Sequence, residues 1–201
     1  MQACRLAATD LACRRGDRVL FGGVGFTLEP GEALHLTGPN GVGKSSLIRI
    51  LAGLLRPLAG VVERDGAVAL ADERPALDPD RPLGEAMGFW VRFDGASQPA
   101  LERALAALEL SGLGEVPVAY LSTGQRKRAT LARMLLAGAP IWLLDEPLNG
   151  LDTASARAVE ALVGDHCASG GIAVIASHQP FRLAAARRFE VDRFAPTGTP
   201  A

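Results

Sequence analysis

The sequence lacks the features that mark several large classes of protein. Only three of its 201 residues are cysteines, and aromatic residues make up 5%. Cys4, Cys13 and Cys167 are widely separated and form no C-x-x-C pair, so we interpret them as reduced, buried thiols. No apolar run approaches the about 20 residues that a membrane-spanning helix needs, and the N-terminus lacks the apolar segment of a signal peptide. We therefore expect a cytoplasmic protein that is not itself a channel.

Charge of either sign is also not in excess. The 21 Lys and Arg residues nearly balance the 22 Asp and Glu residues, which leaves a net charge of −1. This balance argues against general electrostatic capture of nucleic acid or of an anionic membrane. The length and the 48% of hydrophobic residues suffice for a substantial core. We expect one domain over residues 1–194, followed by a disordered tail, 195–201, rich in Pro and Thr.

The pattern of apolar residues before the middle of the chain predicts strands and one helix. Short alternating runs up to Leu28, followed by the turn signal Glu29-Pro30-Gly31, indicate antiparallel strands. A further strand is predicted over Ala33–Thr37. After it, a glycine-rich loop opens into a helix that ends near Gly53, because apolar residues recur there with helical spacing at Leu47, Ile50, Leu51 and Leu54.

The middle of the chain, roughly residues 75–138, is expected to form a helical lobe. One helix begins at a Ser97 cap, and a second runs from about Thr123 to Ala137. The unalternating apolar runs 141–144 and 172–176 are typical of strands buried on both faces of a parallel sheet. The prediction is an α/β fold with a parallel-sheet core, an N-terminal antiparallel β subdomain and an inserted helical lobe.

The glycine-rich loop matches the pattern G-x-x-x-x-G-K-[ST] and stands between a predicted strand and a helix. Backbone N–H groups of such a loop surround phosphate oxygens, and the helix dipole adds positive potential. We expect Lys44 to reach the β- and γ-phosphates of ATP, and the Ser45 hydroxyl to hold Mg²⁺. The residues expected to contact the nucleotide here are Gly38, Pro39, Asn40, Gly41, Val42, Gly43, Lys44, Ser45 and Ser46.

Two carboxylates, Asp145 and Glu146, follow the apolar run 141–144. Ligands bind beyond the carboxyl ends of strands in open α/β sheets. We expect Asp145 to hold the metal's hydration shell and Glu146 to polarise the water that attacks the γ-phosphate.

Upstream of these acids, the segment Leu121-Ser122-Thr123-Gly124-Gln125 begins a helix whose first turn carries the basic run 126–128. The helix dipole disfavours such a run unless an anion docks there. The segment resembles the LSGGQ signature of ATP-binding cassette (ABC) proteins, which belong to the P-loop NTPases. The resemblance implies a homodimer that closes on ATP, in which this segment of one copy holds the γ-phosphate bound to the other. The residues concerned are Ser122, Thr123, Gly124 and Gln125.

Further elements extend the resemblance over about residues 5–194. Residues 148–152 resemble the D-loop of the family, which includes Asp152, and His178 stands where the family has its switch histidine, a γ-phosphate contact. Two departures affect the expected site. The family's Gln (or His) near the start of the helical lobe is Glu73 here, which implies a metal contact that also repels phosphate. No aromatic residue lies near Arg14 to stack on adenine, although an arginine plane can substitute.

A narrower likeness points to one group of ABC proteins. The segments around Phe89-Trp90, Trp142 and Ser177-His-Gln-Pro are similar to the ATP-binding subunits of bacterial cytochrome c maturation, also called haem exporters. That likeness implies CcmB- and CcmC-like integral membrane partners, a peripheral position at the cytoplasmic face of the inner membrane, and release of a haem-loaded chaperone driven by ATP and Mg²⁺. The chain has no C-x-x-C-H motif and offers no haem ligand of that type.

The sequence also bears on other functions of cassette proteins. Cassettes that act on nucleic acid carry a long coiled coil or a second cassette, whereas the interval between Ser46 and Leu121 is short and has no heptads. The remaining alternatives are the ATPase of another small exporter, and an ATP-binding switch that hydrolyses weakly because of Glu73. His35 and His166 have no motif around them, and we expect them to be packing or surface residues.

Overall fold

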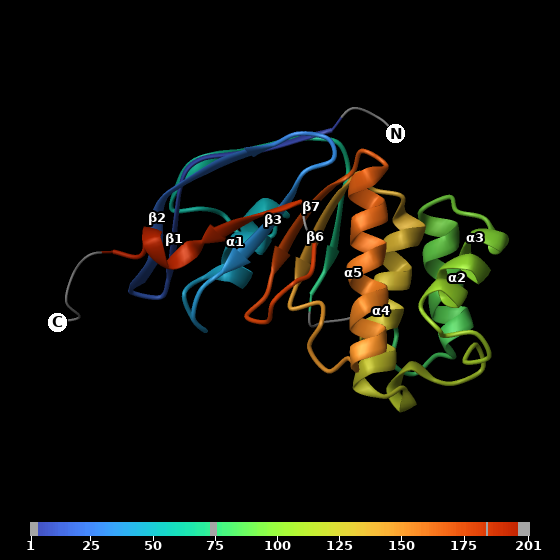
Figure 1. Ribbon diagram of the computed structural model, residues 1–201. Helices are drawn as coiled ribbons and strands as arrows, with labels where there is room; N and C mark the ends of the chain where they lie inside the picture. The colour runs from blue at the N-terminus through green and yellow to red at the C-terminus, as the bar shows by residue number, and fades with distance from the viewer. Residues whose placement is uncertain (1–3, 73–75, 184, 197–201) are drawn as a thin grey trace.

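The computed structural model describes residues 4–72, 76–183 and 185–196. Glu73 and residues 197–201 of the expected tail lie outside this range. The described residues form two sheets and five α-helices, arranged in layers (Figure 1). The prediction of an α/β fold with a parallel core sheet and a separate N-terminal antiparallel sheet is confirmed.

The antiparallel sheet has the strand order β2-β1-β4. Its strands are β1 (Arg5–Arg15), β2 (Arg18–Leu28) and β4 (Ala59–Asp65). The inward residues of β1 and β2 are buried and apolar, which explains why alternating apolar residues in the sequence predicted these two strands. Strand β4 was not predicted, because six of its seven residues are exposed and it carries no apolar alternation. Such a strand is specified by pairing with β1 rather than by its own pattern.

The parallel sheet has the strand order β5-β6-β7-β3-β8. Its strands are β3 (Ala33–Thr37), β5 (Val68–Ala71), β6 (Ile141–Asp145), β7 (Ile172–Ala176) and β8 (Ala186–Glu190). Every residue of β6 and β7 is buried, as their unalternating apolar runs predicted. The edge strands β5 and β8 were not predicted. Strand β5 has only four residues, and β8 carries two exposed arginines.

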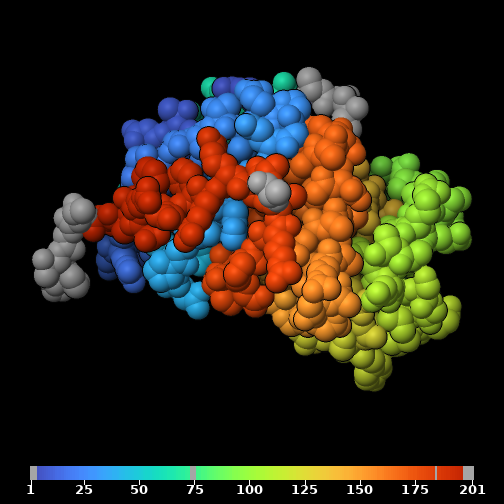
Figure 2. Space-filling view, in the orientation of Figure 1, coloured from blue at the N-terminus to red at the C-terminus, as the bar shows by residue number. Residues whose placement is uncertain are grey.

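The helices cover the two faces of the parallel sheet unequally. Helix α1 (Lys44–Leu51) packs between this sheet and the antiparallel one, where Leu47 and Ile48 are fully buried. The opposite face packs against α4 (Thr123–Ala137) and α5 (Thr153–Ala168), as Figure 1 shows. The helices farthest from the antiparallel sheet are α2 (Leu83–Phe93) and α3 (Gln98–Ala107). They form one end of the molecule in the space-filling view, with α5 between them and the C-terminal segment (Figure 2).

The predicted helix ends are largely confirmed by their caps. The Ser97 hydroxyl accepts a hydrogen bond from the backbone of Ala100 at 3.3 Å, and Gly138 ends α4 in the left-handed conformation. The expected apolar position at Leu54 is wrong, because this side chain is 69% exposed. Gly53 has φ +78°, and both following backbone N–H groups return to the carbonyl of Arg49, so the chain turns away before Leu54.

Cysteine and histidine side chains outside the expected site have structural surroundings, as predicted. All three cysteines are free and buried. The His166 ring stacks on Trp142 with a centroid distance of 3.8 Å, and its Nε2 lies 3.2 Å from the Pro140 carbonyl oxygen. Among the described residues, no helix has the length and apolar character needed to cross a bilayer.

Candidate nucleotide-binding site

The glycine-rich loop requires backbone conformations and space that other residues do not supply. Gly38, Gly41 and Gly43 have φ angles of +135°, +78° and +114°. Gly43 immediately precedes α1, and a Cβ added to it would lie 2.9 Å from a ring carbon of Phe21 on β2. The loop therefore curls tightly between β3 and α1 because these positions carry no side chain.

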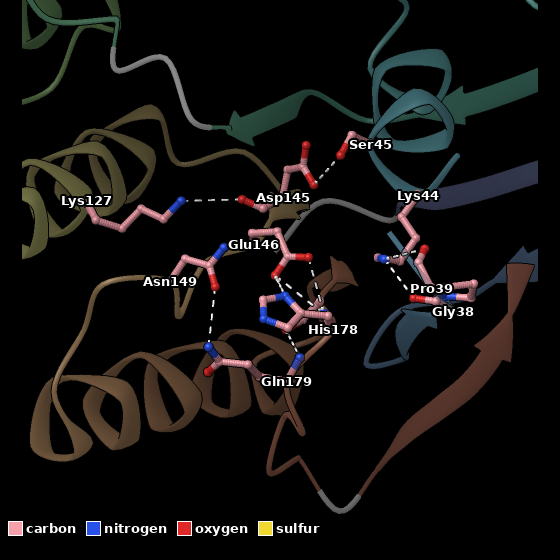
Figure 3. A network of polar contacts seen from close by, with 11 residues as sticks. Gly38, Pro39, Lys44, Ser45, Lys127, Asp145, Glu146, Asn149, His178 and Gln179 are labelled. Carbon is pink, nitrogen blue, oxygen red and sulfur yellow. Dashed lines mark hydrogen bonds and ion pairs between the residues drawn. The ribbon is translucent and has the colours of Figure 1, made fainter. Parts of the chain in front are cut away.

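Lys44, the first residue of α1, is 6% exposed and turns back onto its own loop. Its Nζ donates hydrogen bonds to the carbonyl oxygens of Gly38 at 2.8 Å and Pro39 at 3.2 Å (Figure 3). A buried ammonium needs such partners to offset its lost hydration. The two carbonyl oxygens hold the ammonium group at the loop. An anionic phosphate oxygen could replace them as its hydrogen-bond partners.

Ser45 and Asp145 meet from different elements. The Ser45 hydroxyl, on α1, donates to Oδ1 of Asp145, the last residue of β6, at 3.0 Å (Figure 3). The backbone carbonyl of Asp145 accepts a 3.5 Å hydrogen bond from Nζ of Lys127 on α4. Hydroxyl and carboxylate oxygens are hard ligands, and Mg²⁺ commonly uses one or two of them together with substrate phosphates. The pair therefore fits an Mg²⁺ site shared with a nucleotide.

Glu146, the residue after β6, has a positive φ of 48°. This region costs a non-glycine residue on the order of 1–3 kcal/mol, so surrounding contacts must hold it. The Glu146 backbone N–H donates to the Ala176 carbonyl at 2.8 Å. Its carboxylate accepts the His178 backbone N–H at 3.2 Å and lies 2.9 Å from His178 Nδ1. The strained backbone thus turns the carboxylate toward the loop that follows β7.

The loop after β7 is tied down on both sides of His178. The Ser177 hydroxyl accepts the Gln179 backbone N–H at 3.0 Å, and the Gln179 side chain donates to Asn149 at 3.4 Å (Figure 3). His35 of β3 lines the same hollow as Ser177 and His178. Burial lowers the pKa of His35, which favours the neutral ring. His178 is therefore presented from a fixed loop, although its side chain is 45% exposed.

These elements enclose a pocket of about 400 Å³. It brings most of the expected phosphate loop together with both expected catalytic residues, Glu146 and His178. Its lining residues are Leu20, Asn40, Gly41, Gly43, Lys44, Ser45, Ser46, Glu146, Asn149 and His178. Gly38 lines a neighbouring hollow with His35 and Arg188 instead.

The expected signature residues do not line this pocket in the same chain. The Ser122 hydroxyl accepts the Gln125 backbone N–H at 3.2 Å, and the Gln125 side chain accepts the Ser122 N–H at 2.8 Å, so both residues cap α4. A Cβ on Gly124 would lie 3.1 Å from the Gly150 carbonyl oxygen, and one on Gly150 would lie 3.2 Å from a methyl group of Thr123. The signature segment is therefore packed directly against the loop that follows Glu146.

Asp152, also expected at the nucleotide, is exposed and caps α5. Its carboxylate accepts the Ser155 backbone N–H at 2.8 Å, and this hydrogen bond lowers the pKa of Asp152. Like the signature segment, it does not line the pocket of its own chain. In the described structure its interactions are those of a helix cap.

Sequence reasoning did not name two pocket residues as site residues. Leu20 reaches the pocket from β2, beside Gly43, and Asn149 reaches it from the loop after β6. A leucine in a strand carries no chemical signal, so only the approach of the hairpin to the phosphate loop reveals it. Asn149 lies inside the segment that resembles the D-loop. Its short distance from Glu146 in the sequence could have identified it as a pocket residue.

Comparisons with known proteins identify the family of the chain. The family model described as ABC transporter matches residues 21–149. The chain is 57% identical, over 98% of its length and 100% of the relative's, to a protein of Novosphingobium aromaticivorans named "Cytochrome c biogenesis ATP-binding export protein CcmA". A protein of the same name from Sphingopyxis alaskensis is 51% identical over 86% of this chain and 89% of its own length.

Solved structures show the same fold. An ABC transporter ATP-binding protein from Pyrococcus furiosus superposes with a TM-score of 0.83 at 22% identity, covering 96% of this chain and 100% of its own. The ATP-binding subunit of another ABC transporter gives a TM-score of 0.77 at 25% identity, covering 86% and 79%. With a family model that spans more than half of the chain and full-length relatives above 50% identity, the chain belongs to the ABC transporter family and, within it, to the cytochrome c biogenesis ATP-binding export proteins.

Proposed function

We propose that this protein is the ATP-hydrolysing subunit of a membrane ABC complex for cytochrome c maturation. It is a single ABC ATPase domain over residues 1–194, with the helical lobe at about 75–138. The observation that carries the proposal is the pocket in which Lys44, Ser45, Glu146 and His178 meet. Membership of the family supports ATP hydrolysis, and the names of the relatives support the cytochrome c assignment.

In the proposed mechanism the glycine loop and α1 bind the phosphates. Backbone N–H groups of the loop would donate to phosphate oxygens, and Lys44 would leave its two carbonyl partners for the β- and γ-phosphates. Ser45 and Asp145 would hold Mg²⁺, with Glu73 as a further candidate on the strength of its place in the sequence. When bound, the ion offsets the negative charge of the phosphates.

Hydrolysis itself needs a base and an anchor for the γ-phosphate. Glu146 is the group that would accept a proton from the attacking water, because it lines the same pocket as Lys44. His178, which lines the pocket beside Glu146, would donate a hydrogen bond to a γ-phosphate oxygen. Because the two side chains contact each other now, a bound γ-phosphate that draws His178 away would leave the Glu146 carboxylate available to water.

The signature segment is proposed to act across a homodimer. Ser122 to Gln125 do not line the pocket of their own chain, yet they stand at the N-terminus of α4, where an anion is favoured. Opposed copies would each supply the signature segment to the other's nucleotide. The loop 149–152, which contacts Thr123 and Gly124 through Gly150 and ends at Asp152, would connect the two sites.

The cargo and the partners follow from the family. We propose that hydrolysis drives release of a haem-loaded chaperone, through integral membrane subunits of the CcmB and CcmC type. The protein would lie at the cytoplasmic face of the bacterial inner membrane through these partners, without contacting nucleic acid.

A gene deletion tests this function. We expect the deletion strain to lose haem-stained c-type cytochromes and to keep b-type cytochromes, whose haem is not covalently attached. Haem-bound chaperone should accumulate. Complementation with Arg103→Ala, an exposed position on α3, should restore the c-type proteins, and Glu146→Gln should not. Normal c-type cytochromes in the deletion strain would remove the haem assignment and favour another small exporter.

A second candidate is an ATP-binding switch with weak hydrolysis, which Glu73 favours because a carboxylate there repels phosphate. Steady-state phosphate release with and without the co-purified membrane subunits separates the two. Stimulated turnover supports the exporter subunit. Turnover near zero in both conditions, with ATP bound, supports the switch.

A further inference from the structure

Tyr120 is the chain's only tyrosine and is unusually exposed. Its 81% exposure is the highest among the large hydrophobic side chains of the described residues. An aromatic ring in water is a costly arrangement, and tyrosines of this kind are enriched where one molecule contacts another. The exposure therefore needs an explanation from the place of Tyr120 in the molecule.

The turn that carries Tyr120 is firmly held. It is a short 3₁₀ helix, η1 (Val118–Tyr120), flanked by the buried side chains of Val118 and Leu121. The backbone N–H of Ala119 donates to the Pro79 carbonyl at 2.9 Å, and Arg126 of α4 donates to the Ala119 carbonyl at 3.3 Å. The ring is thus displayed from a fixed support and not from a loose loop.

Tyr120 also stands next to the proposed γ-phosphate contact. It precedes the α4 cap, Ser122, by two residues, which limits the separation of their Cα atoms to about 7 Å. If the N-terminus of α4 binds the γ-phosphate of a nucleotide, residues around that N-terminus can contact the ribose and the base of the same nucleotide. Tyr120 is the large, exposed apolar group at that position.

The phosphate pocket of the chain provides for phosphates better than for a base. Its described lining contains no Phe, Tyr or Trp side chain, and Leu20 is its one large apolar residue. Beyond Leu20, the β1–β2 hairpin tip presents the exposed Arg14, Arg15 and Arg18. Within one copy, a purine would therefore meet aliphatic carbon and guanidinium groups on one face and water on the other.

We propose that Tyr120 of one copy stacks on the purine base of the nucleotide bound at the phosphate loop of the second copy. This inference rests on the proposed opposed homodimer, and it makes each base site incomplete in a single chain. The tyrosine supplies the flat apolar face that the pocket lacks, opposite the hairpin. Stacking of a base on an aromatic ring is worth about 1–3 kcal/mol, so its loss should weaken binding of ATP to the dimer at least fivefold.

Photolabelling with 8-azido-ATP tests the contact directly. The Glu146→Gln variant is mixed with 8-azido-ATP and Mg²⁺, the dimer is isolated by size-exclusion chromatography and irradiated, and labelled peptides are mapped by mass spectrometry. We expect an adduct on the peptide that contains Tyr120. The same sample irradiated as a monomer in EDTA should lose that adduct, because Tyr120 does not line the pocket of its own chain.

Affinity measurements separate stacking from a purely structural effect. Tyr120→Ala in the Glu146→Gln background should bind ATP at least fivefold more weakly, whereas Tyr120→Phe should keep the affinity. Inorganic tripolyphosphate, which has no base, should compete equally well in all three proteins. Phe93→Ala, which removes a 71% exposed aromatic ring on α2, is the matched control and should leave ATP affinity unchanged.

The possible failures point to different conclusions. If no dimer forms with Mg-ATP, the opposed homodimer of the proposed function is wrong. If the dimer forms and labels only hairpin peptides, Tyr120 does not contact the base and the inference is overturned. If Tyr120→Ala keeps ATP affinity and loses co-purification with the membrane subunits, Tyr120 is a docking residue for those subunits, which also overturns it.

Discussion

Nδ1 of His178 lies 2.9 Å from Oε2 of Glu146, and the backbone N–H of His178 donates to the same carboxylate. The carboxylate proposed as the base is thus occupied by the residue proposed to bind the γ-phosphate. Glu146 is held there by a strained backbone with φ 48° and by its hydrogen bond to Ala176. In the proposed mechanism this contact would link arrival of the γ-phosphate to release of the base.

Replacement of the carboxylate by an amide should separate binding from hydrolysis. We expect Glu146→Gln to bind ATP, to lose at least 100-fold in turnover, since positioned proton transfer contributes about 10²–10⁴-fold, and to accumulate as a dimer with Mg-ATP. Phosphate release and size-exclusion chromatography measure the two effects. A variant that turns over ATP at the rate of the unmodified protein would falsify the assignment of Glu146 as the base.

Lys44→Ala should remove most hydrolysis and weaken nucleotide binding. The variant loses the buried cation that two loop carbonyls now hold, and these carbonyls then face the phosphates without a counter-charge. Nucleotide titration and phosphate release are the measurements, with circular dichroism to verify folding. Arg103→Ala, which removes an exposed cation on α3, is the control and should behave as the unmodified protein. Unchanged turnover in Lys44→Ala contradicts the phosphate-loop assignment.

Two glycines of the loop allow backbone strain to be separated from crowding. Gly43 and Gly41 both have positive φ, but a Cβ on Gly43 meets Phe21 at 2.9 Å, whereas one on Gly41 meets nothing within 4 Å. We expect Gly41→Ala to lower the free energy of unfolding by about 1 kcal/mol and Gly43→Ala to lower it further. Urea denaturation measures both. If both variants lose the same free energy of unfolding, the crowding of the added methyl group against Phe21 has no measurable cost.

Sequence reasoning reached the fold class and most of the pocket, and physical causes explain what it did not reach. Strands β6 and β7 were predictable because burial on both faces leaves continuous apolar runs. Strands β4 and β8 were not, because their residues are largely exposed or charged and pairing specifies them. The approach of Leu20 to Gly43, the strain at Glu146 and the Glu146–His178 contact depend on tertiary geometry, which residue spacing does not encode.

The three thiols should be unreactive in the folded protein. Burial raises the pKa of Cys4 and Cys13, and raises that of Cys167 to about 11. At pH 8 the thiolate form, which is the nucleophile, is therefore scarcer than in an unfolded chain. We expect Ellman's reagent to label fewer than one thiol per chain within minutes at pH 8, and all three in 8 M urea. Rapid stoichiometric labelling of the native protein contradicts the buried positions.

Two half-buried histidines, His35 and His166, should make the protein less stable in mild acid. Burial lowers the pKa of His35 and His166 below the ordinary value of 6.5, against the opposing effect of their backbone hydrogen bonds. Two charged groups act on the pKa of His35: Arg188 lowers it and Glu146 raises it. Below pH 6.5 the unfolded chain takes up protons at these rings before the folded chain does. The free energy of unfolding therefore falls as the pH falls.

The slope of that loss is at most about 1.4 kcal/mol per pH unit for each histidine. Urea denaturation at pH 7.5, 6.5 and 5.8 measures it. His166→Phe keeps the stacking on Trp142 but loses the contact of Nε2 with the Pro140 carbonyl, so its free energy of unfolding should be lower at pH 7.5. Because one titrating ring is removed, that free energy should decline less steeply as the pH falls. If His166→Phe declines as steeply as the unmodified protein, protonation of His166 does not control the acid stability, and His35 or the carboxylates must be responsible.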